Sequence, residues 1–182
     1  MSKVLTLRGV ISIADNAISA DTQVFSYEAN DLTRGWVVEA AYMWPTTTRA
    51  GTGSAHGQFQ LVASISTDTI TPIDPTDLTA DMISTAEDNR QIGWLGAGYQ
   101  RRESAVSDFL ANSGNSPNPA AFTIDPEHII AKGVWLNMFT TSDSTTSPTR
   151  DWSYMVVLRP KKLDPKETIL HLIKNVAQDI TN

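Results

Sequence analysis

Apolar and polar side chains alternate along most of the chain before residue 160. This period of two is typical of a β-strand with one buried face, because successive side chains of a strand point to opposite sides of its sheet. The stretch "GQFQLVASIS" at 57–66 shows the pattern most clearly. Its inward set is Phe59, Leu61, Ala63 and Ile65, and its outward set is Gln58, Gln60, Ser64 and Ser66. The pattern predicts a half-buried antiparallel strand.

Similar segments predict seven strands in all, at 5–13, 25–29, 35–45, 57–66, 90–100, 127–141 and 150–159. An eighth strand is expected around Phe109 or Phe122. The segment at 127–141 is apolar on both faces, so we expect it at the centre of a sheet that is covered on both sides. Four other segments each place a set of side chains on one face: Leu5, Leu7, Ile11 and Ile13; Phe25, Tyr27 and Ala29; Trp36, Val38, Ala40, Tyr42 and Trp44; and Trp152, Tyr154, Val156 and Leu158.

The segment 164–182 carries a different, helical pattern. Asp164 suits an N-cap, Pro165 the first helical position and Glu167 the third, which together make a variant of the capping box. The apolar side chains that follow lie at helical spacing, namely Ile169, Leu172, Ile173, Val176 and Ile180. We therefore predict a β-domain over 1–163 and an amphipathic α-helix over 164–182. Because so short a helix is marginal alone in water, its apolar stripe must dock on its own domain or on a neighbour, and these five residues are candidate subunit contacts.

Composition agrees with an all-β domain. The 182 residues are 41% apolar and rich in Ser and Thr, and β-branched and aromatic residues favour pleated sheets. The chain has no cysteine, which excludes disulfides and thiolate chemistry. The first 16 residues make a poor signal peptide, and no run of about 18 apolar residues occurs, so we expect no membrane insertion.

The net charge of −6 is divided unevenly along the chain. Residues 1–126 hold 7 Lys or Arg and 14 Asp or Glu, which gives −7, whereas 127–182 hold 7 and 6, which gives +1. An acidic body disfavours general binding to nucleic acid and can simply keep the protein soluble. The candidate genome-facing residues are Arg159, Lys161 and Lys162, with Lys166 and Lys174 nearby. So few charges predict weak or no direct contact with nucleic acid.

The residue types that carry catalysis form no recognisable set. His56, His128 and His171 lie in unrelated settings without the spacing of metal ligands. Ser54 and His56 in "GTGSAHG" follow a glycine-rich turn but lack the context of a phosphate loop or a nucleophile elbow. The acidic candidates are Asp81, Glu87 and Asp88, and Glu39, Glu103 and Glu127. Neither group has a calcium-loop spacing or a feature that selects a catalytic pair. We predict no catalytic residue, no cofactor and no metal, and hence no enzyme.

Tryptophan leaves a second class of function open. The chain has five tryptophans, and all of them lie in or at the end of predicted strands. Aromatic side chains at regular strand positions more often belong to a core or a subunit interface. Trp44, which lies beside Pro45, and Trp94 are the candidates for exposure. The alternative is therefore a carbohydrate- or ligand-binding β-sandwich, such as a phage adhesin or a lectin-like module.

Two stretches carry a resemblance to a known class. They are "EHIIAKGVWLNMFTTSD" and "RDWSYMVVLRPKKLDPKETILHLIKN", long strands on either side of a polar loop, followed by a C-terminal extension. With long polar loops elsewhere, this outline resembles the single jelly-roll capsid and virion structural proteins of small tailless viruses. The resemblance is one of architecture and spans most of the chain. It implies an antiparallel, jelly-roll-like β-sandwich of about eight strands, with a C-terminal α-helix.

The same resemblance implies a function. Many copies of the chain would assemble into a symmetric shell through their loops and C-terminal helices, with other virion proteins as further partners. The protein would reside in the virion, assembled in the host cytoplasm, and would need no cofactor. The sequence departs from the commonest pattern of RNA-virus coats, which have an N-terminal arm rich in Arg and Lys, because Lys3 and Arg8 are its only early basic residues.

Overall fold

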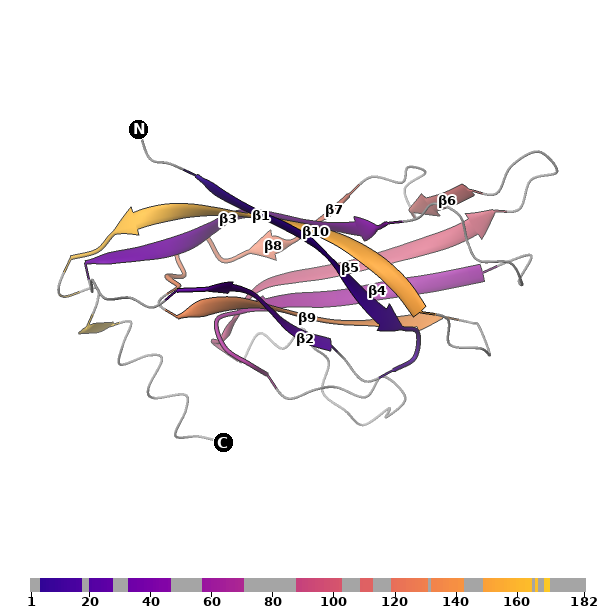
Figure 1. Cartoon of the computed structure of the whole chain (residues 1–182), viewed down its shortest axis with the longest axis horizontal. Coiled ribbons are helices and arrows are strands. Elements are labelled where there is room, and N and C mark those ends of the chain that lie inside the picture. Colours follow the sequence, from indigo (N-terminus) through magenta and orange to yellow (C-terminus); the bar gives the residue numbers. More distant parts are fainter. Residues whose placement is uncertain are drawn as a thin grey trace.

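The structure of the protein is a computed structural model, which describes residues 4–17, 20–27, 33–46, 57–70, 88–102, 109–112, 119–130, 132–142, 149–164, 166 and 169–170. Its strands form two antiparallel sheets that lie face to face (Figure 1). They are β1 (Leu5–Ala14), β2 (Ala20–Ser26), β3 (Arg34–Pro45), β4 (Gly57–Ser66), β5 (Gln91–Arg102), β6 (Phe109–Asn112), β7 (Ala120–Ala121), β8 (Thr123–Ile124), β9 (Gly133–Ser142) and β10 (Thr149–Lys162). The predicted all-β sandwich is confirmed.

Each predicted strand segment overlaps an observed strand, although several bounds differ. The strand expected at 25–29 begins earlier, at Ala20. The one expected at 127–141 begins only at Gly133, and Ile130 before it forms an isolated bridge with Trp36. Strands are present at both positions proposed for an eighth strand, since β6 begins at Phe109 and the short strands β7 and β8 flank Phe122.

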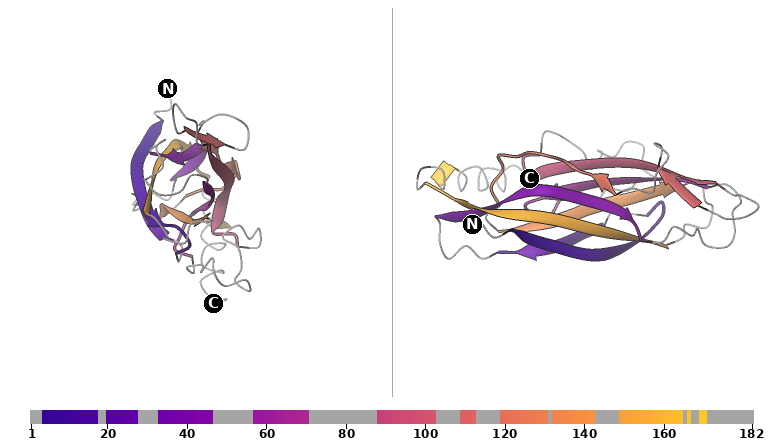
Figure 2. Two further views of the ribbon diagram at one scale, coloured as in Figure 1. Left: turned by 90° about the vertical axis from the view of Figure 1, so that its right-hand side faces the viewer. Right: turned by 90° about the horizontal axis from the view of Figure 1, so that it is seen from above.

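The strand order is nested. One sheet has the order β1-β10-β3-β7, and the other has β2-β9-β4-β5-β6, with β8 also paired to β5. The first strand thus pairs with the last, β2 with β9, β3 with β7 and β4 with β5, so the chain resembles one long hairpin wound around a common core. The first four strands alternate between the sheets, whereas β4, β5 and β6 all belong to the same one, and the two layers are seen end-on in Figure 2. The buried Phe122 marks the crossing between the sheets, because β7 belongs to one and β8 to the other.

The core lies between the inner faces of the two sheets, where the predicted alternation largely holds. Phe59, Leu61, Ala63 and Ile65 of β4 are all buried, as expected. On β10, Trp152, Val156 and Leu158 are fully buried, and Tyr154 packs against the same cluster. On β1, Ile11 and Ile13 are buried, with Leu5 and Leu7 half-buried above the core. The central position of β9 is also confirmed, since almost all of its side chains are covered.

A β-bulge overturns the prediction for the segment 35–45. The register between β3 and β10 shifts where Val157 pairs with Ala40 and Leu158 pairs with Val38, which leaves Glu39 as the extra residue. A bulge of one residue exchanges the two faces of a strand beyond it. The core is therefore lined by Val38 on one side of the bulge and by Ala41 and Met43 on the other. The expectation that Trp36, Val38, Ala40, Tyr42 and Trp44 share one face is wrong.

The outer face of β4 also differs from the prediction. Ser64 and Ser66 were expected to face solvent, yet both are fully buried. Ile70 and Phe139 form a second, smaller apolar cluster with Val62, so part of this outer face is covered as well as the inner one. A period of two identifies a polar face but does not show whether solvent reaches it.

Three aromatic rings pack together in the core. Phe59 of β4 stacks on Tyr99 of β5 at 5.2 Å between ring centroids, and Trp152 of β10 contacts both, at 5.9 and 5.6 Å. Edge-to-face and offset contacts at such distances are favourable for aromatic rings. Because Trp152 belongs to one sheet and the other two rings to the opposite sheet, this cluster joins the two layers.

Burial raises the pKa of Tyr99 to about 12, which predicts a loss of stability in alkali. An unfolded tyrosine ionises near pH 10, so above that pH the unfolded state releases a proton that the folded state still holds. We expect the free energy of unfolding to fall between pH 10 and 12, by about 3 kcal/mol from this group. Urea unfolding of Tyr99→Phe, which cannot ionise there, should show a shallower fall with pH. An equal fall in both proteins would contradict the assignment.

The predicted C-terminal helix is not established. Of the segment 164–182, the structure describes only Asp164, Lys166, Ile169 and Leu170; the last three are helical, but no helix is defined among the described residues. The Oδ1 atom of Asp164 does accept a hydrogen bond from the backbone N–H of Lys166 at 3.0 Å, as an N-cap would. One cap bond does not make a helix, so the helix stays a prediction. β10 itself continues to Lys162, which is further than expected.

Candidate interaction surfaces

The residues weighed for catalysis do not come together in the described part of the chain. Glu39 lies exposed at the bulge of β3, and Glu127 lies exposed before β9, next to the half-buried His128. No group of three or more His, Asp or Glu able to hold a metal ion occurs among the described residues. The other candidates lie outside the described residues, namely Ser54, His56, Asp81, Glu87, Glu103 and His171.

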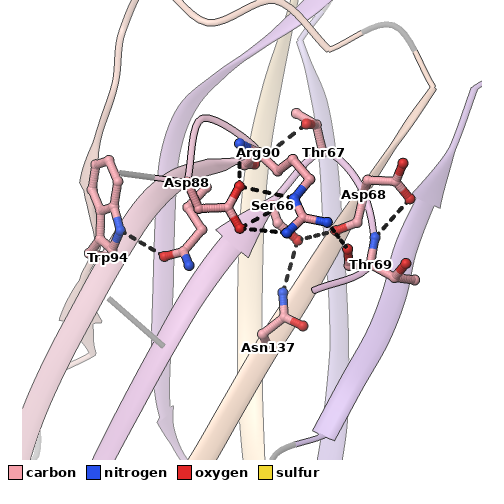
Figure 3. Close-up of polar contacts among 9 residues, drawn as sticks. Ser66, Thr67, Asp68, Thr69, Asp88, Arg90, Trp94 and Asn137 are labelled. Atoms are coloured by element: carbon pink, nitrogen blue, oxygen red, sulfur yellow. Dashed lines mark hydrogen bonds and ion pairs between the residues drawn. The ribbon is translucent and has the colours of Figure 1, made fainter. Parts of the chain in front are cut away.

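Asp88, one of the weighed carboxylates, is engaged in an ion pair. Its two oxygens accept hydrogen bonds from Nε and Nη2 of Arg90, at 2.9 and 2.8 Å (Figure 3). Burial alone would raise the pKa of Asp88, but the hydrogen bonds and charge of Arg90 outweigh it, and the pKa is lowered. Nη1 of Arg90 also donates to the carbonyl of Thr69 at 3.2 Å. The pair therefore links the segment after the end of β4 to the segment before the start of β5.

A second set of polar bonds surrounds this pair. Nδ2 of Asn137 donates to Oγ of Ser66 at 2.9 Å, and that hydroxyl donates to the carbonyl of Asp68 at 2.6 Å (Figure 3). Thr67 contributes a backbone N–H to the carbonyl of Arg90 at 2.9 Å. These bonds explain why Ser66 can be buried, since a buried hydroxyl needs a partner. The arrangement fastens the end of β4 and the start of β5 to the middle of β9 and has no feature of a reaction centre.

The basic cluster lies within β10, not in a hinge after it. Arg159 and Lys162 are exposed and Lys161 is half-buried. The register places Lys162 opposite Arg34 of β3, which is also exposed. The structure thus brings a fourth cation to this end of the sheet. Sequence reasoning missed Arg34 because only the pairing of β3 with β10 joins it to the cluster.

The two tryptophans weighed as exposed platforms lie far apart in the fold. Trp44 belongs to β3 in one sheet and Trp94 to β5 in the other. Both are half-buried, and Nε1 of Trp94 donates to Oε1 of Gln91 at 3.0 Å. Since they face outward from opposite sheets, they do not form one aromatic surface for a sugar.

Among the described residues, large apolar side chains are exposed in two places. Val4 and Val10 lie on or beside β1 and are 51% and 55% exposed. Ile169 and Leu170, in the segment predicted as a helix, are 59% and 56% exposed. Ile169 was predicted as a contact residue, whereas Leu170 was not. The other predicted contacts lie outside the described residues, namely Leu172, Ile173, Val176 and Ile180.

The described residues include no helix that is long and apolar enough to cross a membrane. No protein-family model matches the chain, and no curated protein matches it. Among solved structures the chain is similar to one described as "Structure of Turnip Yellow Mosaic Virus at 100 K", with 15% sequence identity over 91% of this chain and 99% of that chain. The TM-score is 0.37, and a likeness at this level carries no argument about function.

Proposed function

We propose that this protein is a non-enzymatic structural protein, a coat subunit that self-assembles into the symmetric shell of a virus. The nested strand order carries the proposal. Pairing of β1 with β10, β2 with β9, β3 with β7 and β4 with β5 is the arrangement of a jelly roll. Jelly rolls of this two-sheet kind are built into viral capsid proteins, and also into lectins and cupins. Because several classes of protein share this fold, the function has to be argued from the surfaces of the molecule.

The described surfaces favour the coat subunit over a ligand-binding module. Trp44 and Trp94 lie on opposite sheets, so they offer no shared platform for a sugar. Asp88 is held by Arg90, and the polar groups around the pair are bonded to one another. By contrast, exposed apolar side chains occur at β1 and at the start of the C-terminal segment. Contacts between copies of the chain are the simplest use for such side chains.

The C-terminal segment is proposed to contact a neighbouring subunit in the shell. Ile169, the first residue of the predicted stripe, is 59% exposed, which supports a contact outside its own sandwich. An amphipathic helix needs a partner for its apolar stripe to be stable. The basic end of the sheet, with Arg34, Arg159 and Lys162, is proposed to give at most a weak contact with the genome, because the body of the protein is acidic.

The substitution Leu172→Asp tests this function. A carboxylate in the middle of the apolar stripe would have to be buried in the subunit contact, which is strongly unfavourable without a partner. We expect the variant to elute as smaller species in size-exclusion chromatography and to show no particles by negative-stain microscopy, while its far-ultraviolet circular dichroism keeps the β-signature. Lys174→Asp, off the stripe, is the matched control and should assemble. Normal particles from Leu172→Asp would show that the segment makes no essential contact.

A further inference from the structure

The two sheets have four edges, and three of them are blunted. Among the described strands, the edge strands are β1 and β7 in one sheet, and β2 and the pair β6 and β8, which both lie beside β5, in the other. β7 has two residues, β6 has four, and the register of β2 shifts between Gln23 and Phe25. Short strands and bulges are ordinary devices that prevent one sheet edge from pairing with another.

The fourth edge has none of these devices. β1 has ten residues, and its register with β10 is unbroken from Leu5 to Ala14. It contains no proline and no lysine, and Arg8 is its single charged residue. In the described part of the chain no other strand pairs with it, so every second residue directs its N–H and C=O away from the sheet. The indigo strand runs along the lower margin of the right-hand view in Figure 2.

We propose that β1 pairs with β1 of a second copy of this chain, antiparallel and across a two-fold axis. The pairing would join the two four-stranded sheets into one continuous sheet, a recognised mode of strand addition. The proposal rests on the proposed function only in taking the partner of β1 to be another copy of the chain. The sequence of β1 supports that partner, because two copies of the strand are complementary to one another.

The self-complementary register is centred on Gly9. Odd-numbered residues of β1 must lie opposite odd-numbered ones and even-numbered opposite even-numbered, since otherwise the apolar face of one strand would meet the exposed face of the other. Centring on Gly9 pairs Leu7 with Ile11 above the core and Arg8 with Val10 on the outer face. Centring on Arg8 instead would set two like charges directly opposite and leave the end of the strand unpaired. The Gly9 register pairs nine of the ten residues of β1, from Leu5 to Ile13.

Such a contact is expected to be weak in an isolated dimer. One strand pair is smaller than the interface of about 800 Å² per partner that stable complexes bury. In a shell each subunit makes several contacts at once, and their combined effect greatly exceeds that of each contact alone. The edge is thus suited to an assembly that must form reversibly before it closes.

Charge at Val10 tests the proposal. In the proposed register a lysine at position 10 faces Arg8 of the second copy, and this pair occurs twice in each dimer. Val10→Lys should therefore raise the dimer Kd about tenfold, whereas Val10→Glu should lower it by a similar factor. Analytical ultracentrifugation measures both changes. Gln60→Lys adds the same charge to an exposed position of the central strand β4 and should leave the Kd unchanged. Equal behaviour of the two lysine variants, or a wild-type protein that stays monomeric at every concentration, overturns the proposal.

Cross-linking tests the register. The chain has no cysteine, so Arg8→Cys and Val10→Cys each carry a single thiol, and Gly9, where Tyr154 fills the space beside the backbone, is left intact. Oxidation of an equimolar mixture should give covalent dimers several times faster than oxidation of either variant alone. Equal rates overturn the Gly9 register. If Val10→Lys forms normal shells, the β1 contact is wrong but the coat function is not. If the wild-type protein forms dimers but no shells, the coat function is wrong but the β1 contact is not.

Discussion

Replacing Trp152 with alanine is expected to lower the free energy of unfolding by about 4 kcal/mol. The indole is fully buried and contacts both Phe59 and Tyr99, so its loss opens a cavity at the contact between the sheets. A domain of this size is stable by only about 5–15 kcal/mol, so the variant should unfold at a much lower urea concentration. Circular dichroism during urea titration measures the effect.

Two variants control this result. Trp152→Phe keeps a ring in the core and removes Nε1, which has no hydrogen-bond partner among the described residues, so it should cost much less than alanine. Trp44→Ala removes the same side chain from a half-buried position on the outer face and should also cost less. If Trp152→Ala and Trp44→Ala lost equal stability, the core would not lie where the strand pairing places it.

Replacing Asp15 with alanine is expected to destabilise the fold by about 3 kcal/mol. The carboxylate of Asp15 is fully buried and accepts hydrogen bonds from Oγ1 of Thr140 at 2.8 Å and from Nε of Arg150 at 2.8 and 2.9 Å. The guanidinium of Arg150 also lies 4.0 Å from the centre of the Phe59 ring. Without Asp15, a largely buried cation would lose its counter-charge. Thermal and urea unfolding monitor the loss.

The position of Asp15 explains why one carboxylate matters so much. It begins the turn after β1 and joins the start of β10 to the end of β9, which belong to different sheets. The exposed Asp151, which accepts a hydrogen bond from Ser12, is the matched control, and its replacement by alanine should change stability by less than about 1 kcal/mol. A similar loss from both variants would show that the buried ion pair contributes no more than a surface contact.

The strands that could be predicted are those whose pattern is undisturbed. In β4 and β10 the side chains alternate without interruption, and the residues expected in the core are there. β3 has an equally regular sequence, but the extra residue at Glu39 is set by its pairing with β10, and no local pattern reveals it. The burial of Ser64 depends in the same way on what covers the outer face. Local alternation shows which side chains share a face of a strand. The register of the strand, and whether other residues bury its outer face, depend on distant parts of the chain.

The interaction surfaces were less predictable than the fold. The basic cluster was visible at Arg159, Lys161 and Lys162, yet Arg34 joins it only through strand pairing across more than a hundred residues. The open edge of β1 was equally hidden. Its ten residues read as an ordinary half-buried strand, and only the strand order shows that one side of it has no neighbour among the described strands.

The central claim, that this protein is a self-assembling coat subunit, is tested most directly by the state of the purified wild-type chain. Size-exclusion chromatography and negative-stain microscopy over a range of salt and protein concentrations measure that state. A self-assembling coat subunit should form closed particles of uniform diameter, which elute far ahead of the 19.9 kDa monomer. A monodisperse monomer at every concentration and salt would contradict it.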